Sequence, residues 1–310
     1  MNVVFGDVVL GVHGKGFDYL FSYQEGGPVS FVVGGMEWLY RAPKPTFWRA
    51  TTCNDRGNHF PERSSMWMGA DLFIGTKQVE VFADGEPVEG FLAPDNNRLV
   101  DSPLRHPRTV EARYTYATCT TPSTDVVVGY LVRSNGTIEV SVSYQGKRGL
   151  PELPVFGIRF IMPTVADGFT YQGLSGETYP DRMAGGVRGT YHVDSLPVTP
   201  YLVPQECGMH METDRLQVFR TIDGKRAALE FRKHGPRFAF SALPYTALEL
   251  ESATHQEELP PARRTVLCLL GAVRGVGGIN SWGADVEPQY HIPSDKDISY
   301  SFLITPSSLS

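Results

Sequence analysis

Two runs of residues on either side of Asn135-Gly136 constrain the fold of this chain more than any other feature. Residues 126–132 form a continuous, mostly β-branched apolar run, and in residues 138–144 apolar side chains alternate with glutamate and serine. An alternation of period two is typical of a strand with one buried face. Asn-Gly favours a hairpin turn, because both residues tolerate positive φ. The sequence therefore predicts an antiparallel hairpin here.

Further short runs of the same kind predict more strands along the whole chain. They lie at residues 77–82, 111–118, 156–162, 227–231, 238–241, 265–270 and 298–303. Glycine and proline together supply 55 (32 + 23) of the 310 residues, which is typical of many turns. Helical patterns are few, at 64–72 and 246–255. We expect an all-β protein, a large antiparallel sandwich, with residues 1–310 forming a single domain.

Charge and hydropathy exclude several classes of partner. The net charge is −6 and no Lys/Arg run exceeds two residues, so the footprint of a nucleic-acid-binding protein is missing. No apolar stretch is long enough to span a membrane, and the first residues do not resemble a signal peptide. Four scattered cysteines show no zinc-like spacing, which predicts free thiols and no metal site. We expect a soluble, cytoplasmic protein.

Two groups of polar residues are weak candidates for chemistry. Glu177 and Asp181 could form the carboxylate pair of a glycosidase, but in a Gly/Pro loop Asp181 is more simply explained as the cap of a turn. Cys207, His210 and Glu212 offer metal ligands, but alternate residues of a strand point to opposite faces. We therefore interpret both groups as structural.

Two loops are stronger candidates. In the first, Trp48 is expected in the core, and a polar segment follows that ends at Gly57, a residue able to act as a hinge. The second, at residues 274–283, is rich in glycine and carries Trp282. An indole face stacks well on the C–H face of a sugar ring, so Trp282 is a candidate carbohydrate platform, with an ordinary packing role as the alternative. The residues alone predict no complete catalytic set.

The same segments carry a resemblance that runs nearly from end to end. The motifs are Thr46-Phe47-Trp48-Arg49-Ala50, Asn54-Asp55-Arg56-Gly57, residues 150–157, residues 173–182, Pro204-Gln205-Glu206-Cys207-Gly208 and residues 277–282. In this order they resemble the C-terminal domain of bacterial β-galactosidases of glycoside hydrolase family 2. They are still more similar to the small subunits of heterodimeric lactobacillal β-galactosidases. Cys53 departs from the family, which usually has an acidic residue there.

The resemblance implies a supersandwich of the galactose mutarotase type and a role in hydrolysing terminal β-D-galactosides such as lactose. In the family, the two catalytic glutamates and most Mg²⁺ and Na⁺ ligands lie on a TIM barrel. This chain has no βα repeat from which to build one. The resemblance therefore implies a non-catalytic chain, inactive alone, that binds no cofactor or metal. Its expected partner is a β-galactosidase large subunit, which would supply the barrel, Mg²⁺ and Na⁺.

The resemblance also assigns residues. Trp282 matches a tryptophan that borders the active site and stacks on the sugar. Gly57, Asn58 and His59 match a mobile loop beside that site, and the motif at Asp181 is carried over as structural only. Two alternatives remain open. One is a free-standing sugar epimerase that uses His192, His210 and Glu206 as acid and base. The other is a carbohydrate-binding module.

Overall fold

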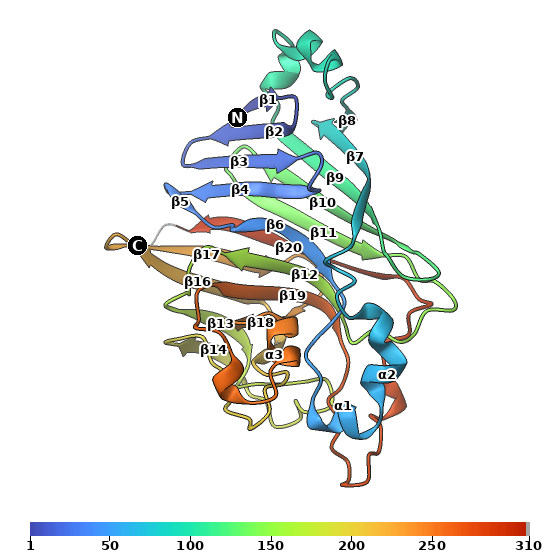
Figure 1. Ribbon diagram of the computed structural model, residues 1–310. Helices are drawn as coiled ribbons and strands as arrows, with labels where there is room; N and C mark the ends of the chain where they lie inside the picture. Colours follow the sequence, from blue (N-terminus) through green and yellow to red (C-terminus); the bar gives the residue numbers. More distant parts are fainter. Residues whose placement is uncertain (308–310) are drawn as a thin grey trace.

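The computed structural model describes residues 1–307 and contains three antiparallel sheets arranged in two layers (Figure 1). One layer is a ten-stranded sheet. The other consists of two five-stranded sheets placed end to end, with the fourth and sixth strands of the chain lying next to each other where they meet.

The first five-stranded sheet contains, in spatial order, β1 (Asn2–Phe5), β2 (Val9–Gly14), β3 (Phe17–Ser22), β4 (Gly27–Val33) and β5 (Met36–Glu37). The second contains β15 (Met209–Thr213), β18 (Phe238–Leu243), β19 (Thr265–Val273), β12 (Val155–Met162) and β6 (Arg41–Thr46). The ten-stranded sheet contains β14 (Arg188–Val193), β13 (Gly168–Leu174), β16 (Arg215–Ile222), β17 (Lys225–Lys233), β20 (Ile298–Ser307), β11 (Ile138–Tyr144), β10 (Asp125–Arg133), β9 (Thr109–Ala117), β7 (Gly75–Ala83) and β8 (Glu86–Pro87).

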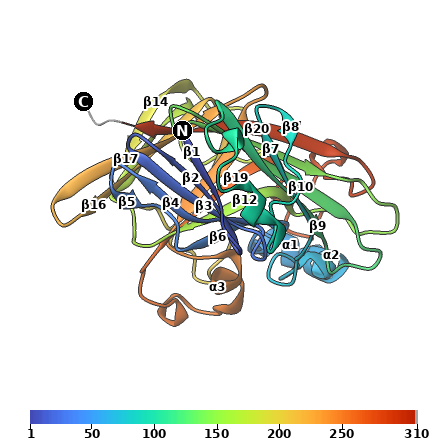
Figure 2. The same cartoon turned by 90° about the horizontal axis from the view of Figure 1, so that it is seen from above.

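The helices are short. The α-helices are α1 (Cys53–Gly57), α2 (Phe60–Ser64) and α3 (Ala247–Ser252), and the 3₁₀ helices are η1 (Ser65–Trp67), η2 (Asp95–Leu99), η3 (Pro103–Arg105), η4 (Gln256–Glu258) and η5 (Pro288–Tyr290). All three α-helices lie on the same side of the strands in Figure 2. Within residues 1–307 we find no helix with the length and apolar character needed to cross a membrane.

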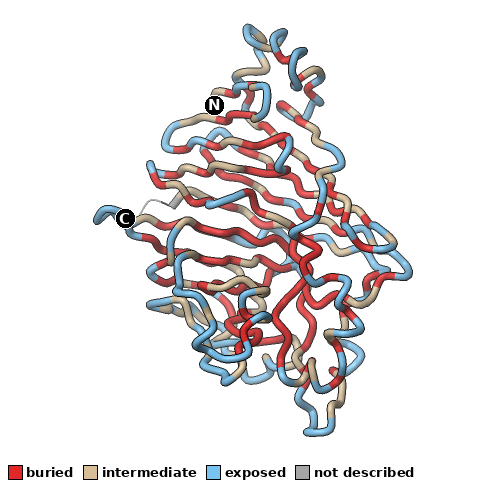
Figure 3. Tube along the Cα trace, viewed as in Figure 1, coloured by how far each residue is buried: buried red, intermediate tan, exposed pale blue. Residues whose placement is uncertain are grey.

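Aromatic rings fill the space between the layers. Phe21 of β3 meets Tyr130 of β10 with ring centroids 5.8 Å apart, and Phe160 of β12 meets Phe231 of β17 at 5.9 Å. Both halves of the composite layer thus pack on the ten-stranded sheet. Figure 3 shows buried residues running along the strands of both layers, while exposed residues concentrate in the connections.

The predicted all-β antiparallel sandwich is confirmed, and so is the hairpin at its centre. β10 pairs with β11 in an uninterrupted antiparallel register. The turn differs in detail, because Gly136 has a φ of 83° whereas Asn135 does not enter the positive-φ region. The Gly136 N–H donates to the Arg133 carbonyl at 2.8 Å, and the Asn135 side chain accepts from Thr137 N–H at 3.0 Å. Glycine alone therefore supplies the left-handed residue.

The two predicted helices are shorter than expected. The prediction for 64–72 is wrong over most of its length, because α2 ends at Ser64, one 3₁₀ turn follows, and Gly69 with φ 72° breaks the segment. The prediction for 246–255 corresponds to α3. Thr246 and Glu249 form a capping box at its start, and the chain becomes extended at Ala253.

Candidate functional site

The two loops singled out in the sequence lie side by side at one end of the sandwich. Gly57 ends α1, and its carbonyl oxygen would lie 2.5 Å from a Cβ atom built on Gly283, which has a φ of 77°. Asn58 follows directly and donates from Nδ2 to Asp285 Oδ1 at 3.3 Å. Glycine at 283 is thus needed twice, for its backbone conformation and for the close approach.

Trp282 projects from the second of these loops and is 89% exposed. Its backbone is held in place, since Asn280 Oδ1 accepts from the N–H groups of Trp282 at 2.9 Å and of Ala284 at 3.3 Å. Trp282 is therefore not packed in the core of this chain. A fixed backbone with an exposed indole is what a stacking platform requires.

His59 forms the turn between α1 and α2. Its φ of 61° is left-handed, and α2 begins directly after it at Phe60, with Pro61 in the first turn of the helix. Its side chain is exposed and lies 3.6 Å from Glu62, measured from Nδ1 to Oε1. Gly57 and Asn58 thus contact the segment that carries Trp282, and His59 follows them in the chain.

A buried ionic cluster underlies both loops. Arg49, which follows β6, makes a two-pronged contact to Asp55 of α1, with distances of 2.6 Å and 3.2 Å. Arg274, which follows β19, reaches the same carboxylate at 3.1 Å. All three side chains are buried. Burial opposes ionisation of Asp55. The positive charge of Arg49 and the hydrogen bonds from Arg49 and Thr52 outweigh it, and they hold the pKa of this carboxyl below its usual value.

Arg274 extends this cluster to the Trp282 loop. Its Nη2 donates to Asp285, which also accepts from Arg63 at 2.6 Å. Its Nε donates to Glu152 at 3.1 Å, and the other carboxylate oxygen of Glu152 contacts His291. Asp285 thereby ties the Trp282 loop both to the first loop and to the core.

Among residues 1–307, Glu152, Asp285 and His291 bring one ligand atom each within 4.8 Å of one another, a geometry that could hold a metal ion. The Arg274 guanidinium hydrogen-bonds both carboxylates of this group. A positive charge from the protein itself therefore already pairs with both carboxylates. We interpret the group as part of the ionic cluster.

Asp181 has a structural role, but it binds the backbone of a distant loop and does not cap a turn of its own loop as predicted. Its carboxylate accepts from Val276 N–H at 3.0 Å and from Gly277 N–H at 2.7 Å, and Arg182 donates to the Gly277 carbonyl. Glu177 instead contacts Thr199 at 3.2 Å. Because the Asp181 oxygens are engaged by the backbone, the two carboxylates do not form a glycosidase pair.

The residues considered for an epimerase or a metal site do not converge. His192 is exposed and contacts Thr170 and Asp194. His210 is buried against Tyr171, with ring centroids 4.5 Å apart, and against Phe240, with ring centroids 4.7 Å apart. Desolvation lowers the pKa of His210 to about 4. Glu212, at a strand irregularity with φ 54°, contacts Arg237.

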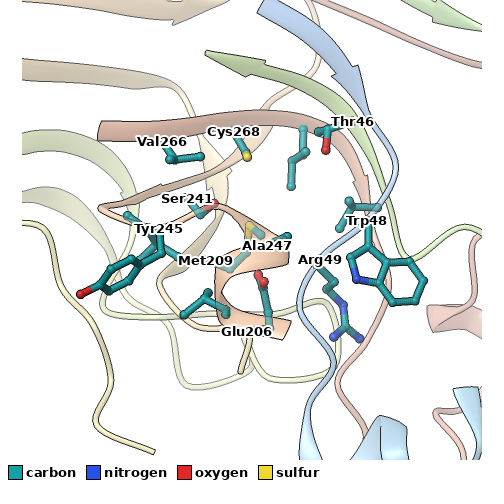
Figure 4. A pocket seen from close by; sticks show the side chains of 14 residues that line it. Thr46, Trp48, Arg49, Glu206, Met209, Ser241, Tyr245, Ala247, Val266 and Cys268 are labelled. Carbon is teal, nitrogen blue, oxygen red and sulfur yellow. The ribbon is translucent and has the colours of Figure 1, made fainter. Parts of the chain in front are cut away.

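Glu206 lines an internal cavity of about 30 Å³ beside Trp48, Arg49 and Cys268 (Figure 4). Trp48 is buried, as predicted. Its Nε1 and the Nε of Arg49 have no hydrogen-bond partner among the described residues. The cavity is lined mostly by apolar side chains, and its volume leaves room for about one water molecule. Burial raises the pKa of Glu206 to about 8; Arg49 acts in the opposite direction, and Glu177 adds to the increase.

Glu206→Gln should remove part of the pH dependence of stability. The pKa of Glu206 is about 8 in the folded chain against 4.5 in the unfolded chain, so its contribution is complete below pH 4.5 and is lost as the pH rises through 8. Between pH 6.5 and 8, the free energy of unfolding of the parent should fall by about 2 kcal/mol more than that of the variant. His210 titrates below this window. Urea unfolding at several pH values measures this difference, and parallel curves would show that Glu206 is ionised throughout.

Sequence reasoning missed the roles of Asp55, Arg274 and Asp285. All three residues lie within or beside the motifs considered above. Because charged residues are usually exposed, their charge indicated that they lie in surface loops. Only the fold brings Arg274 to Asp55, 219 positions away. The sequence signal available for these roles was a charged residue directly next to an aromatic or glycine motif.

The chain that forms this sandwich, with a hydrogen-bonded aromatic loop at one end, belongs to a family of β-galactosidase chains. The family model "Beta galactosidase small chain" matches residues 13–304, and the chain belongs to that family. It is 56% identical to the "Beta-galactosidase small subunit" of Latilactobacillus sakei, and the match covers 98% of each chain.

Longer proteins match as well. The chain is 31% identical to a "Beta-galactosidase" of Streptococcus thermophilus and 32% identical to one of Halalkalibacterium halodurans. These matches cover 99% and 98% of this chain but 28% of each of those proteins. Among solved structures, a putative aldose 1-epimerase from Escherichia coli K12 is similar with a TM-score of 0.46 and 10% identity, over 97% of this chain and 99% of that one.

Proposed function

We propose that this chain is the small, non-catalytic subunit of a heteromeric β-galactosidase that hydrolyses terminal β-D-galactosides such as lactose. The 56% identity to a small subunit over its full length supports this assignment. In the longer relatives, a segment matching this chain makes up 28% of one polypeptide. We infer that a separate large subunit supplies the remainder, in an enzyme of glycoside hydrolase family 2 whose C-terminal domain this chain corresponds to.

One observation carries the proposal: the exposed indole of Trp282 stands at an end of the sandwich where the nearby carboxylates are already engaged. Asp55 and Asp285 are bonded to arginines, and Asp181 is bonded to backbone N–H groups. A retaining glycosidase needs two carboxyl groups about 5 Å apart and available to substrate. The partner would therefore supply both catalytic glutamates, and we propose that it also holds Mg²⁺ and Na⁺.

The proposed role of this end of the chain is to complete the sugar site. Trp282 would stack on the sugar, and the consecutive residues Gly57, Asn58 and His59 would border it. The hydrogen bond from Asn58 to Asp285 links the two loops, so a movement of one loop should displace the other. A sugar epimerase is less favoured, because His192, His210 and Glu206 face different surroundings.

The experiment that tests the proposal is a β-galactosidase assay on lactose with this chain alone, with a large subunit alone, and with their mixture. Substantial turnover only in the mixture is the expected result. An anomer-interconversion assay on galactose with this chain alone tests the epimerase alternative, for which we expect no rate above buffer.

A further inference from the structure

A second apolar feature lies at the same end of the sandwich as Trp282. We call residues 196–205, which connect β14 to β15, the apolar loop. Leu202 within it is 91% exposed, and Val198 and Tyr201 are also exposed. Single exposed apolar residues are ordinary, but several on one short loop typically mark an interaction surface.

The apolar loop also forms one wall of a pocket. The pocket has a volume of about 250 Å³, and its lining combines Val198 and Tyr201 with Tyr245, Leu250 and Leu259 from the segments around α3. The loop is fastened there, because Gln256 Nε2 donates to the Tyr201 carbonyl at 2.6 Å. An exposed leucine beside a largely apolar pocket offers both a projection and a cavity to a partner.

The apolar loop is continuous with the proposed sugar site through α1. Gln205 Oε1 accepts from Cys53 N–H at 2.8 Å, and Arg56 donates to the Pro204 carbonyl at 3.3 Å. The other end of α1 is Gly57, which abuts Gly283 of the Trp282 loop. In Figure 1 the connections that carry these residues gather at the lower end of the molecule. One surface therefore runs from Leu202 across α1 to Trp282.

We propose that the apolar loop and its pocket are the docking site for the large subunit. This inference rests on the proposed function: if the partner supplies the catalytic carboxylates, it must approach Trp282, and α1 places the apolar loop beside that approach. The large subunit should be large enough to contact both features. In the longer relatives, the segment that matches this chain is only 28% of the protein, and the large subunit would correspond to the remainder. The large subunit should place apolar side chains against Leu202 and into the pocket.

The test measures the affinity of the purified large subunit for variants of this chain, by biolayer interferometry with sedimentation velocity as a second method. Leu202→Asp places a charge in the contact and should weaken binding at least tenfold. Val100→Asp is the matched control, because Val100 is also an exposed apolar residue but lies at the opposite end of the sandwich, after η2 (Figure 1). Its affinity should stay within twofold of the parent. Leu202→Arg repeats the test with the opposite charge.

The outcomes separate this inference from the proposed function. Parent-like affinity of both Leu202 variants would overturn the docking site, whatever the activity of the parent mixture. Weakened binding of these variants would support the docking site even if the parent complex fails to hydrolyse lactose, a result that would overturn the proposed function alone. If the variants change only the self-association of this chain, the apolar loop joins two copies and the inference is wrong.

Discussion

Asp55→Ala should lower the free energy of unfolding by about 3–5 kcal/mol. The carboxylate is buried between two buried guanidinium groups, Arg49 at 2.6 Å and Arg274 at 3.1 Å. Removing it leaves two like charges facing each other away from water, and breaking a buried ion pair on one side typically costs this much. The N–H and hydroxyl groups of Thr52, the N-cap residue of α1, also lose the carboxylate that accepts their hydrogen bonds.

Urea unfolding monitored by tryptophan fluorescence measures the effect. The matched control is Asp95→Ala, because Asp95 pairs with Arg98 at 3.0 Å but both side chains are largely exposed. This variant should lose less than about 1 kcal/mol. A loss below 1 kcal/mol for Asp55→Ala as well would mean that Arg49 and Arg274 do not depend on this carboxylate.

Trp282→Ala should lower kcat/KM for lactose about tenfold in the reconstituted enzyme. Stacking of an aromatic ring contributes about 0.5–1.5 kcal/mol between two aromatic rings, and we expect a similar gain on a sugar face. A loss of 1.4 kcal/mol corresponds to a factor of ten. Because the side chain is 89% exposed and its loop is held by backbone hydrogen bonds to Asn280, stability should change by less than about 0.5 kcal/mol.

Two further variants make this prediction specific. Trp282→Phe keeps an aromatic face and should recover part of the lost kcat/KM. Ile279→Ala removes another exposed apolar side chain from the same loop and should leave kcat/KM within about twofold of the parent. Equal losses for Ile279→Ala and Trp282→Ala would indicate a general disturbance of the loop. Unchanged kinetics for Trp282→Ala would remove the stacking role.

The strands that sequence reasoning found are those with visible side-chain alternation or a continuous apolar run, such as β10 and β12. β9 and β11 alternate between buried and partly exposed positions, and their pattern alone predicted them. β14, on an edge of its sheet, places only Tyr191 and Val193 against the core, and two apolar residues are too few to establish a pattern. In the N-terminal sheet, short strands such as β1 and β5 give too few residues for a period to appear.

The candidate site shows the same limit. Composition indicated that each loop is polar, rich in glycine and able to carry function, and the structure places both at one end of the sandwich. Their contact depends on Asn58 meeting Asp285, 227 positions later, which no local pattern encodes. The buried cluster beneath them was invisible for a physical reason: Arg274 is stable in the interior only because Asp55, Asp285 and Glu152 surround it.

The most direct test of the central claim is the rate of lactose hydrolysis by this chain and a large subunit, each measured separately and then mixed at increasing ratios. We expect negligible turnover from this chain alone and a rate in the mixture that rises until the large subunit is saturated. Lactose hydrolysis by this chain alone would contradict the account, because it would require a pair of catalytic carboxylates that we assign to the partner. A mixture no faster than the large subunit alone would equally contradict it.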